Sequence, residues 1–159
     1  MKNIDIKKNI ASQWFRELQV NICQELELIE KINGKLNKRF SKKKWNRNKT
    51  GSNDLGGGEM RLLRGEVFEK AGVNVSTVYG KLSKKLTGKI PGTRNNSEFW
   101  ASGISLVAHM RSPKCPAVHM NTRMFWTSKG WWFGGGTDLN PMVEEIEDTR
   151  FFHKTLEKA

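Results

Sequence analysis

Apolar residues recur at helical spacing along the first thirty residues. Six of them follow one another at intervals of three or four positions: Ile10, Trp14, Leu18, Ile22, Leu26 and Ile29. This spacing places them on one stripe of a helix, with Glu, Gln and Lys on the other side. Asn33 and Gly34 both tolerate the positive φ that ends a helix. We therefore expect one amphipathic helix over residues 4–33, whose role is packing.

The segment after this helix changes to basic and then to glycine-rich composition. Between Lys35 and Lys49 the sequence KLNKRFSKKKWNRNK has eight basic residues and no acidic residue. Gly, Ser, Asn and Asp gather between Thr50 and Gly58, which is typical of loops. One interpretation of residues 35–59 is a solvated connector. The alternative is a binding surface for nucleic acid or anionic lipid. Since motifs that read bases are absent, we do not expect nucleic acid as a partner.

From residue 60 the hydrophobic period changes to two, which is typical of strands. Val73, Val75, Thr77 and Tyr79 are expected on one face of a strand, and Asn74, Ser76 and Val78 on the other. Gly65 and Gly72 are expected to form turns, and the polar residues 81–97 a loop. Further antiparallel strands are predicted over residues 103–110, 117–126 and 131–133.

Polar side chains share faces of these last strands. Ser105 and His109 lie on one face of the strand at 103–110. His119, Asn121 and Arg123 lie on one face of the next strand. If the two faces coincide, these side chains converge on a surface that is too polar for a core and suits a ligand site.

The last predicted element is a helix over residues 143–159. Acidic residues occupy its first turns and Lys154 and Lys158 lie near its end, as the helix dipole favours. The chain stops inside this helix without a capping residue. We therefore expect a fragment of a longer domain.

Composition narrows the class of protein. The 159 residues suffice for one domain, with helix over 1–34, a connector over 35–59, a sheet over 60–142 and helix over 143–159. This order of helices and antiparallel strands predicts an α+β fold. No apolar run approaches the roughly 20 residues that span a bilayer.

Two cysteines without CxxC spacing favour a reducing compartment, the cytoplasm. A net charge of +12 favours a polyanionic partner.

The chemistry of the polar residues points to a carboxylate ligand. Arg123 beside amide and hydroxyl groups is suited to gripping a carboxylate. His109 and His119 have the side chain that transfers protons near neutral pH. Asp138 follows three glycines and a threonine, and is expected on a tight turn where it holds a cationic or N–H-bearing centre.

Each of these assignments has an alternative. His109 and His119 are equally compatible with hydrogen-bonded core histidines. A metal site of His109, His119 and His153 matches no standard zinc spacing. Asp138 is also compatible with a carboxylate that bonds its own turn. The aromatic run at 131–133 is more typical of a core than of a stacking surface.

Longer motifs carry a family resemblance. The segments GGGEMRLLRGEVFEKAGVNVSTVYGKL, GISLVAHMRSPKCPAVHMNTR and WWFGGGTDLNP resemble the oxygen-dependent coproporphyrinogen III oxidase family of haem biosynthesis. The resemblance implies a homodimer with a broad antiparallel sheet. It implies that molecular oxygen converts two propionates of coproporphyrinogen III to vinyl groups, giving protoporphyrinogen IX, carbon dioxide and peroxide. No organic cofactor is implied.

The resemblance also implies roles for individual residues. It makes His119 the proton donor and gives Asp138 contact with the pyrrole N–H groups. Substrate contacts are implied for Ser105, Asn121, Thr122 and Arg123. A divalent metal is implied only for some bacterial members, with His109, His119 and His153 as ligands.

Some positions depart from the family pattern. Met110 and Asn140 stand where the family has proline and threonine, and Lys114-Cys115 is atypical. Family chains continue well beyond the position of Ala159, so the resemblance covers their N-terminal portion. We expect the isolated chain to show little turnover. The competing classes are a basic binding module and a non-functional gene remnant.

Overall fold

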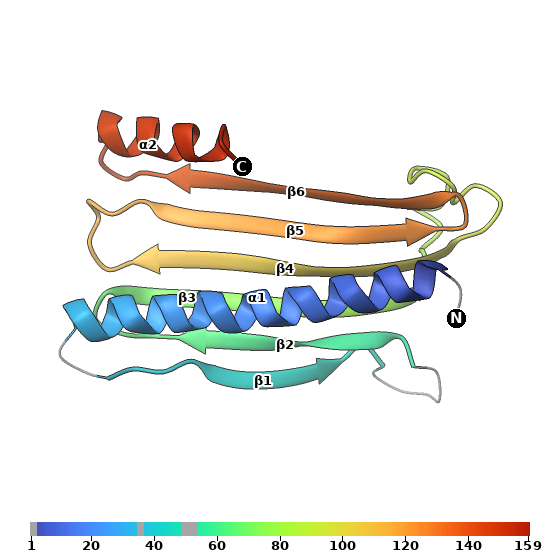
Figure 1. Cartoon of the computed structure of the whole chain (residues 1–159), viewed down its shortest axis with the longest axis horizontal. Coiled ribbons are helices and arrows are strands. Elements are labelled where there is room, and N and C mark those ends of the chain that lie inside the picture. Colours follow the sequence, from blue (N-terminus) through green and yellow to red (C-terminus); the bar gives the residue numbers. More distant parts are fainter. Residues whose placement is uncertain (1–2, 35–36, 49–53) are drawn as a thin grey trace.

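The chain folds into one antiparallel sheet with two helices (Figure 1). The computed structural model describes residues 3–34, 37–48 and 54–159. Its elements are α1 (Asn3–Asn33), β1 (Ser41–Asn46), β2 (Gly56–Leu63), β3 (Phe68–Lys81), β4 (Glu98–Met110), β5 (Ala117–Thr127), β6 (Gly130–Asn140) and α2 (Ile146–Leu156). Each strand pairs with its neighbour in sequence, in the order β1-β2-β3-β4-β5-β6. The predicted α+β class is confirmed.

The core lies between α1 and the centre of the sheet. It includes Phe15 of α1 and alternate residues of the central strands, namely Val73, Val75, Ile104, Ala108 and Met124. Burying large side chains such as Phe15 contributes about 1.5–3 kcal/mol each. Because strand side chains alternate, the residues between these core positions project on the opposite side of the sheet. We call this side, opposite α1, the open face.

Helix α1 is confirmed, but its buried stripe differs from the apolar stripe that the sequence shows. The most deeply buried residues of α1 are Ala11, Ser12, Phe15, Gln19, Cys23 and Glu30. Leu18, Ile22 and Leu26 of the predicted stripe are partly buried and pack against the core. Ile10 and Trp14 are instead 64% and 51% exposed. The buried stripe lies one position along from the apolar one and includes polar side chains that bond the sheet. No described helix is long and apolar enough to cross a membrane.

Gln19 joins α1 to the sheet through two buried hydrogen bonds. Its Nε2 donates to the backbone oxygens of Glu59 and Val73, at 3.0 and 2.8 Å. We expect Gln19→Ala to lower the free energy of unfolding by about 1–2 kcal/mol, because two buried acceptors lose a donor. Urea denaturation measures this change. The control Gln13→Ala, on an exposed position of the same helix, should change stability by about 0.5 kcal/mol at most. Equal midpoints for both variants would contradict the role of Gln19.

The predicted connector over 35–59 was wrong where the structure describes it. Residues 41–46 form β1, and β2 begins at Gly56. Residues 35–36 and 49–53 lie outside the described part of the chain. The sequence SKKKWN gives no apolar alternation because β1 is an exposed strand at the edge of the sheet, where lysines discourage pairing with other chains. Alternation also divides its lysines between the two faces: Lys43 lies on the open face, and Lys42 and Lys44 lie on the α1 side.

Glycines also led to wrong predictions of where the strands begin and end. Gly72 lies inside β3, where a turn was predicted. The predicted strand 131–133 extends to Asn140, and the glycines at 134–136 belong to it. A Cβ at Gly135 would lie 2.2 Å from the Asn121 carbonyl oxygen, so β5 and β6 approach more closely than a side chain there allows.

The second helix, α2, spans Ile146–Leu156 and is shorter than the predicted 143–159. The loop predicted over residues 81–97 is confirmed from residue 82, since β3 ends at Lys81. Short connections over residues 111–116 and 128–129 join the last three strands.

Candidate functional site

The strand register brings the predicted polar faces together. Ser105 pairs with Asn121, and Val107 pairs with His119, so the faces of β4 and β5 coincide on the open face. Asp138 joins them because it pairs with His119 from β6. It lies in a strand, which corrects the predicted tight turn. Thr122 lies on the opposite side, paired with the core residue Ile104.

A chain of hydrogen bonds fixes His119. Its Nδ1 lies 2.7 Å from Oδ1 of Asp138, which also accepts from Nδ2 of Asn140 at 2.6 Å. A carboxylate only accepts, so Nδ1 of His119 is the donor and carries the proton. Nε2 of neutral His119 then has a free lone pair. It faces Nε2 of His109 at 3.3 Å, within reach of a shared proton.

The same pair of nitrogens fits two ligands of one metal ion. Nitrogens bound to a tetrahedral ion at about 2.0–2.1 Å lie roughly 3.3 Å apart, which matches the Nε2–Nε2 distance of 3.3 Å. A carboxylate on the other nitrogen of His119 is typical of metal-binding histidines. His153 lies on α2, where its ring contacts Phe152. Within the described ranges, no group of three or more His, Cys, Asp and Glu side chains is close enough to hold a metal.

Arg123 and its neighbours offer donors to an anion. Nη2 of Arg123 donates to Oδ1 of Asn121 at 2.9 Å. This bond occupies the amide oxygen and leaves the Asn121 N–H groups and the remaining guanidinium N–H groups available. Ser105 lies beside Asn121 on β4. These side chains line a hollow of about 380 Å³ in the open face, with Trp45 of β1 and Asn74 of β3.

A second hollow, of about 500 Å³, continues the site towards the loop over residues 82–97. Lys89 and Pro91 line it together with Arg123, Phe125 and Trp132. The Phe125 ring stacks on Trp132, with centroids 5.3 Å apart, and on Phe99, at 5.7 Å. The open face therefore has an aromatic wall beside its cationic groups. Trp132 belongs to this wall, while Trp131 lies on the α1 side, paired with Trp126.

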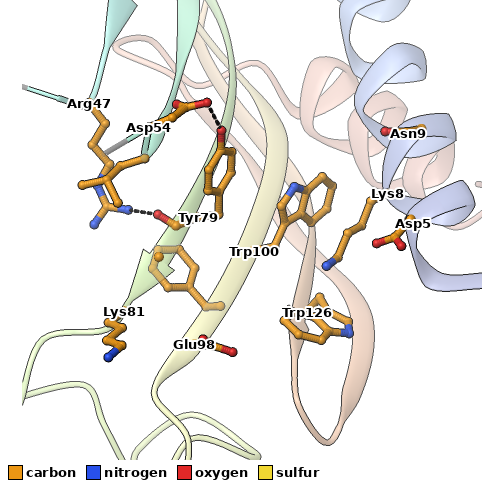
Figure 2. A pocket seen from close by; sticks show the side chains of 13 residues that line it. Asp5, Lys8, Asn9, Arg47, Asp54, Tyr79, Lys81, Glu98, Trp100 and Trp126 are labelled. Carbon is orange, nitrogen blue, oxygen red and sulfur yellow. Dashed lines mark hydrogen bonds between the residues drawn. The ribbon is translucent and has the colours of Figure 1, made fainter. Parts of the chain in front are cut away.

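A larger cavity, of about 1040 Å³, is lined by residues of the first turns of α1 (Figure 2). Some of its polar groups contact other residues of its lining. The Tyr79 hydroxyl donates to Asp54, which raises the pKa of Tyr79 and lowers that of Asp54. Nζ of Lys8 lies 3.7 Å from the Trp126 ring centroid, and burial lowers the pKa of Lys8. The open face is the better candidate for the site because the histidines, Asp138 and Arg123 converge there.

The sequence analysis assigned no function to two residues of the open face. Asn140 was only a departure from the family pattern, yet it bonds Asp138. Its position two residues after Asp138 on the same strand face was the available signal. Asn74 was placed on a strand face without a role.

Comparison with known proteins shows which family this sequence matches. Residues 10–159 match the family described as coproporphyrinogen III oxidase. The oxygen-dependent coproporphyrinogen-III oxidase of Rickettsia felis is 46% identical over 156 residues, which cover 96% of this chain and 54% of that protein. The protein of the same name from Rickettsia bellii is 45% identical over 159 residues, 96% of this chain and 55% of its own length. The chain thus spans about half the length of the curated relatives it matches.

Proposed function

The chain belongs to the coproporphyrinogen III oxidase family, and on that premise we propose that its open face binds coproporphyrinogen III for oxygen-dependent oxidative decarboxylation to protoporphyrinogen IX. The observation that carries the proposal is the convergence of His109, His119, Asp138 and Arg123 on one face. The relatives are oxygen-dependent coproporphyrinogen-III oxidases, which supports molecular oxygen as the oxidant.

The open face suits both kinds of polar group on this substrate. Coproporphyrinogen III has four propionates, and the donors of Arg123, Asn121 and Ser105 suit a carboxylate. Its pyrrole N–H groups need acceptors, and the Asp138 carboxylate is one. Thr122 lies on the other side of the sheet, so its side chain has no part in this proposal. The net charge of +12 favours approach of a tetra-anion.

The reaction needs a proton donor. For each propionate, the carboxylate-bearing C–C bond and one C–H bond break, a C=C bond forms, and oxygen takes two electrons. The balance is propionate carboxylate plus O₂ plus one proton, giving vinyl, CO₂ and H₂O₂. His119 supplies that proton from Nε2 when its ring is in the doubly protonated imidazolium form, while Asp138 accepts from Nδ1 and holds the ring in place. His109, at 3.3 Å from Nε2, passes the next proton to it.

His109 and His119 would also hold a divalent metal. His153 is the third ligand that the family resemblance implies, although the structure does not bring it to this pair. A bound ion would supply Lewis-acid stabilisation of an anionic oxygen. We expect the chain to bind Zn²⁺, measured by isothermal titration calorimetry in the absence of substrate. Asp138→Asn should weaken this binding about tenfold to a hundredfold, because it removes the carboxylate that orients His119.

The control for the metal prediction is His153→Ala. If His153 is a ligand, this variant also loses affinity, and if only the pair binds, it does not. Zn²⁺ affinity that is unchanged in His119→Ala would contradict a metal site at this pair.

The function is tested by titrating the chain with coproporphyrinogen III under nitrogen and then admitting oxygen. We expect saturable binding under nitrogen. Where turnover follows, vinyl product, CO₂ and H₂O₂ should form in the proportions of the balance above. The proposal fails if no saturable binding is measured.

Assembly and location follow from the same premise. We propose a cytoplasmic homodimer, as the family resemblance implies. Analytical ultracentrifugation of the purified chain measures its mass in solution, and a monomer at all concentrations would contradict a dimer formed by this part of the protein.

A further inference from the structure

Asn74 has an unexplained polar atom in the middle of the open face. Among the side chains that the structure describes, its Oδ1 is the buried polar atom without a hydrogen-bond partner. A buried amide oxygen without a donor destabilises a fold, and such groups are rare. An apolar side chain of similar size would give a more stable strand. Stability therefore does not account for an asparagine here.

The position of Asn74 in the sheet suggests its partner. Asn74 pairs with Ser105, and Ser105 pairs with Asn121, so the three side chains form a row across β3, β4 and β5. Side chains of directly paired residues lie about 4.5–5.5 Å apart at Cβ. All three line the hollow of about 380 Å³ that Arg123 also lines. Asn74 thus extends the proposed carboxylate-binding group by one strand.

The chemistry of the row indicates which ligand group Asn74 meets. With Oδ1 buried, the end of the amide left to face the hollow is Nδ2, a donor of two N–H groups. Asp138, the acceptor proposed for pyrrole N–H groups, lies on β6, three strands away or roughly 14 Å across the ladder. At that distance Asn74 meets the periphery of a tetrapyrrole, where the carboxylates are, and not its centre.

We propose that Asn74 is a substrate-binding residue whose amide N–H groups bind a propionate carboxylate, together with Ser105, Asn121 and Arg123. This inference rests on the proposed function of the open face. A carboxylate accepts several hydrogen bonds, and the guanidinium of Arg123 alone does not use them all. Asn74 then orients one propionate and favours substrates that have a carboxylate at this position.

The test compares Asn74→Ala with Asn74→Asp. Both variants are titrated with coproporphyrinogen III under nitrogen, and their thermal unfolding is measured without ligand. We expect Asn74→Ala to bind about fivefold to tenfold more weakly, with a melting temperature that is unchanged or higher, because the unpaired oxygen is gone. Asn74→Asp has nearly the same shape but faces the ligand's carboxylate with another carboxylate, so it should bind more weakly still. Asn21→Ala and Asn21→Asp, on an exposed position of α1, are the matched controls and should bind as wild type does.

The outcomes separate this inference from the proposed function. Saturable binding by wild type with unchanged affinity in both Asn74 variants overturns the role of Asn74 and leaves the proposed function standing. Asn74→Asp binding as well as Asn74→Ala, or better, overturns the contact with a carboxylate. Weaker binding that accompanies a lower melting temperature overturns it too, because Asn74 would then act through the fold. No binding by wild type overturns the proposed function and this inference with it.

Discussion

Replacing Glu30 with alanine is expected to lower the free energy of unfolding by about 3–4 kcal/mol. Glu30 is fully buried, and its carboxylate accepts backbone N–H bonds from Glu66, Val67 and Phe68. The connection between β2 and β3 lies so close to the Glu30 carboxylate that a Cβ at Gly65 would lie 2.2 Å from Cδ of Glu30. Removing the carboxylate leaves these donors without an acceptor and leaves a cavity at the end of α1. Thermal unfolding should therefore shift down by roughly 10 °C.

The pH dependence of this effect has a definite sign. Burial opposes ionisation of Glu30, but the N–H groups of residues 66–68 and the charge of Arg111 outweigh it and lower the pKa of the carboxyl. A carboxyl with a lowered folded pKa stabilises the fold above its unfolded pKa of about 4.3, and this contribution is lost as pH falls through the folded value. The stability difference between wild type and Glu30→Ala should thus be constant near neutral pH and shrink in acid.

Glu25→Ala is the control for Glu30→Ala. It makes the same substitution at an exposed position of the same helix, and should change stability by about 0.5 kcal/mol at most. Urea denaturation at neutral and at acidic pH measures both variants. Similar losses for the two, or a Glu30 effect that grows as pH falls, would contradict the buried carboxylate as the anchor of this loop.

Arg123→Glu is expected to weaken binding of coproporphyrinogen III about a hundredfold or more. The substitution removes the charge-assisted donors, worth about 1.5–3 kcal/mol, and places a negative charge against a carboxylate. It also removes the donor that holds Oδ1 of Asn121. Calorimetric titration under nitrogen measures the loss, and thermal unfolding of the free variant should change little because Arg123 is exposed.

Lys44→Glu separates specific binding from general attraction. It makes the same change in net charge on the α1 side of β1, where Lys44 pairs with Glu59. Charges more than about 8 Å from the ligand are largely screened at physiological salt, so we expect at most about a threefold loss. Equal losses in the two variants would mean that the net charge of +12 attracts the tetra-anion without a defined site.

Strict alternation made part of this site predictable. Ser105, His119 and Asn121 were assigned to faces by period two alone, and the register then brought those faces together. The register between β4 and β5 depends on where each strand begins. No single side chain of either strand determines that position. Asp138 was placed on a turn because three glycines usually indicate one, whereas here they allow two strands to approach closely.

Other features depend on tertiary packing and left little trace in the sequence. The exposed β1 is held by backbone pairing with β2 and buries no face of its own. Its sequence is therefore rich in lysine and resembles a loop. The polar Gln19 and Glu30 belong to the buried stripe of α1 because the sheet supplies their partners. The orphaned oxygen of Asn74 exists only in the folded strand. The proposed role of His153 stays a prediction, and in α2 its ring contacts Phe152.

The tryptophans report directly on which face binds the substrate. Trp132 stacks on Phe125 on the open face, and Trp45 lines its central hollow. Trp100 and Trp126 lie on the α1 side and line the cavity of Figure 2. With ¹⁵N-labelled tryptophan, the indole N–H resonances of the two faces can be followed in one NMR titration with coproporphyrinogen III under nitrogen. We expect the Trp132 and Trp45 resonances to shift with saturation while those of Trp100 and Trp126 stay in place. Shifts confined to Trp100 and Trp126, or no shifts at all, would contradict substrate binding on the open face.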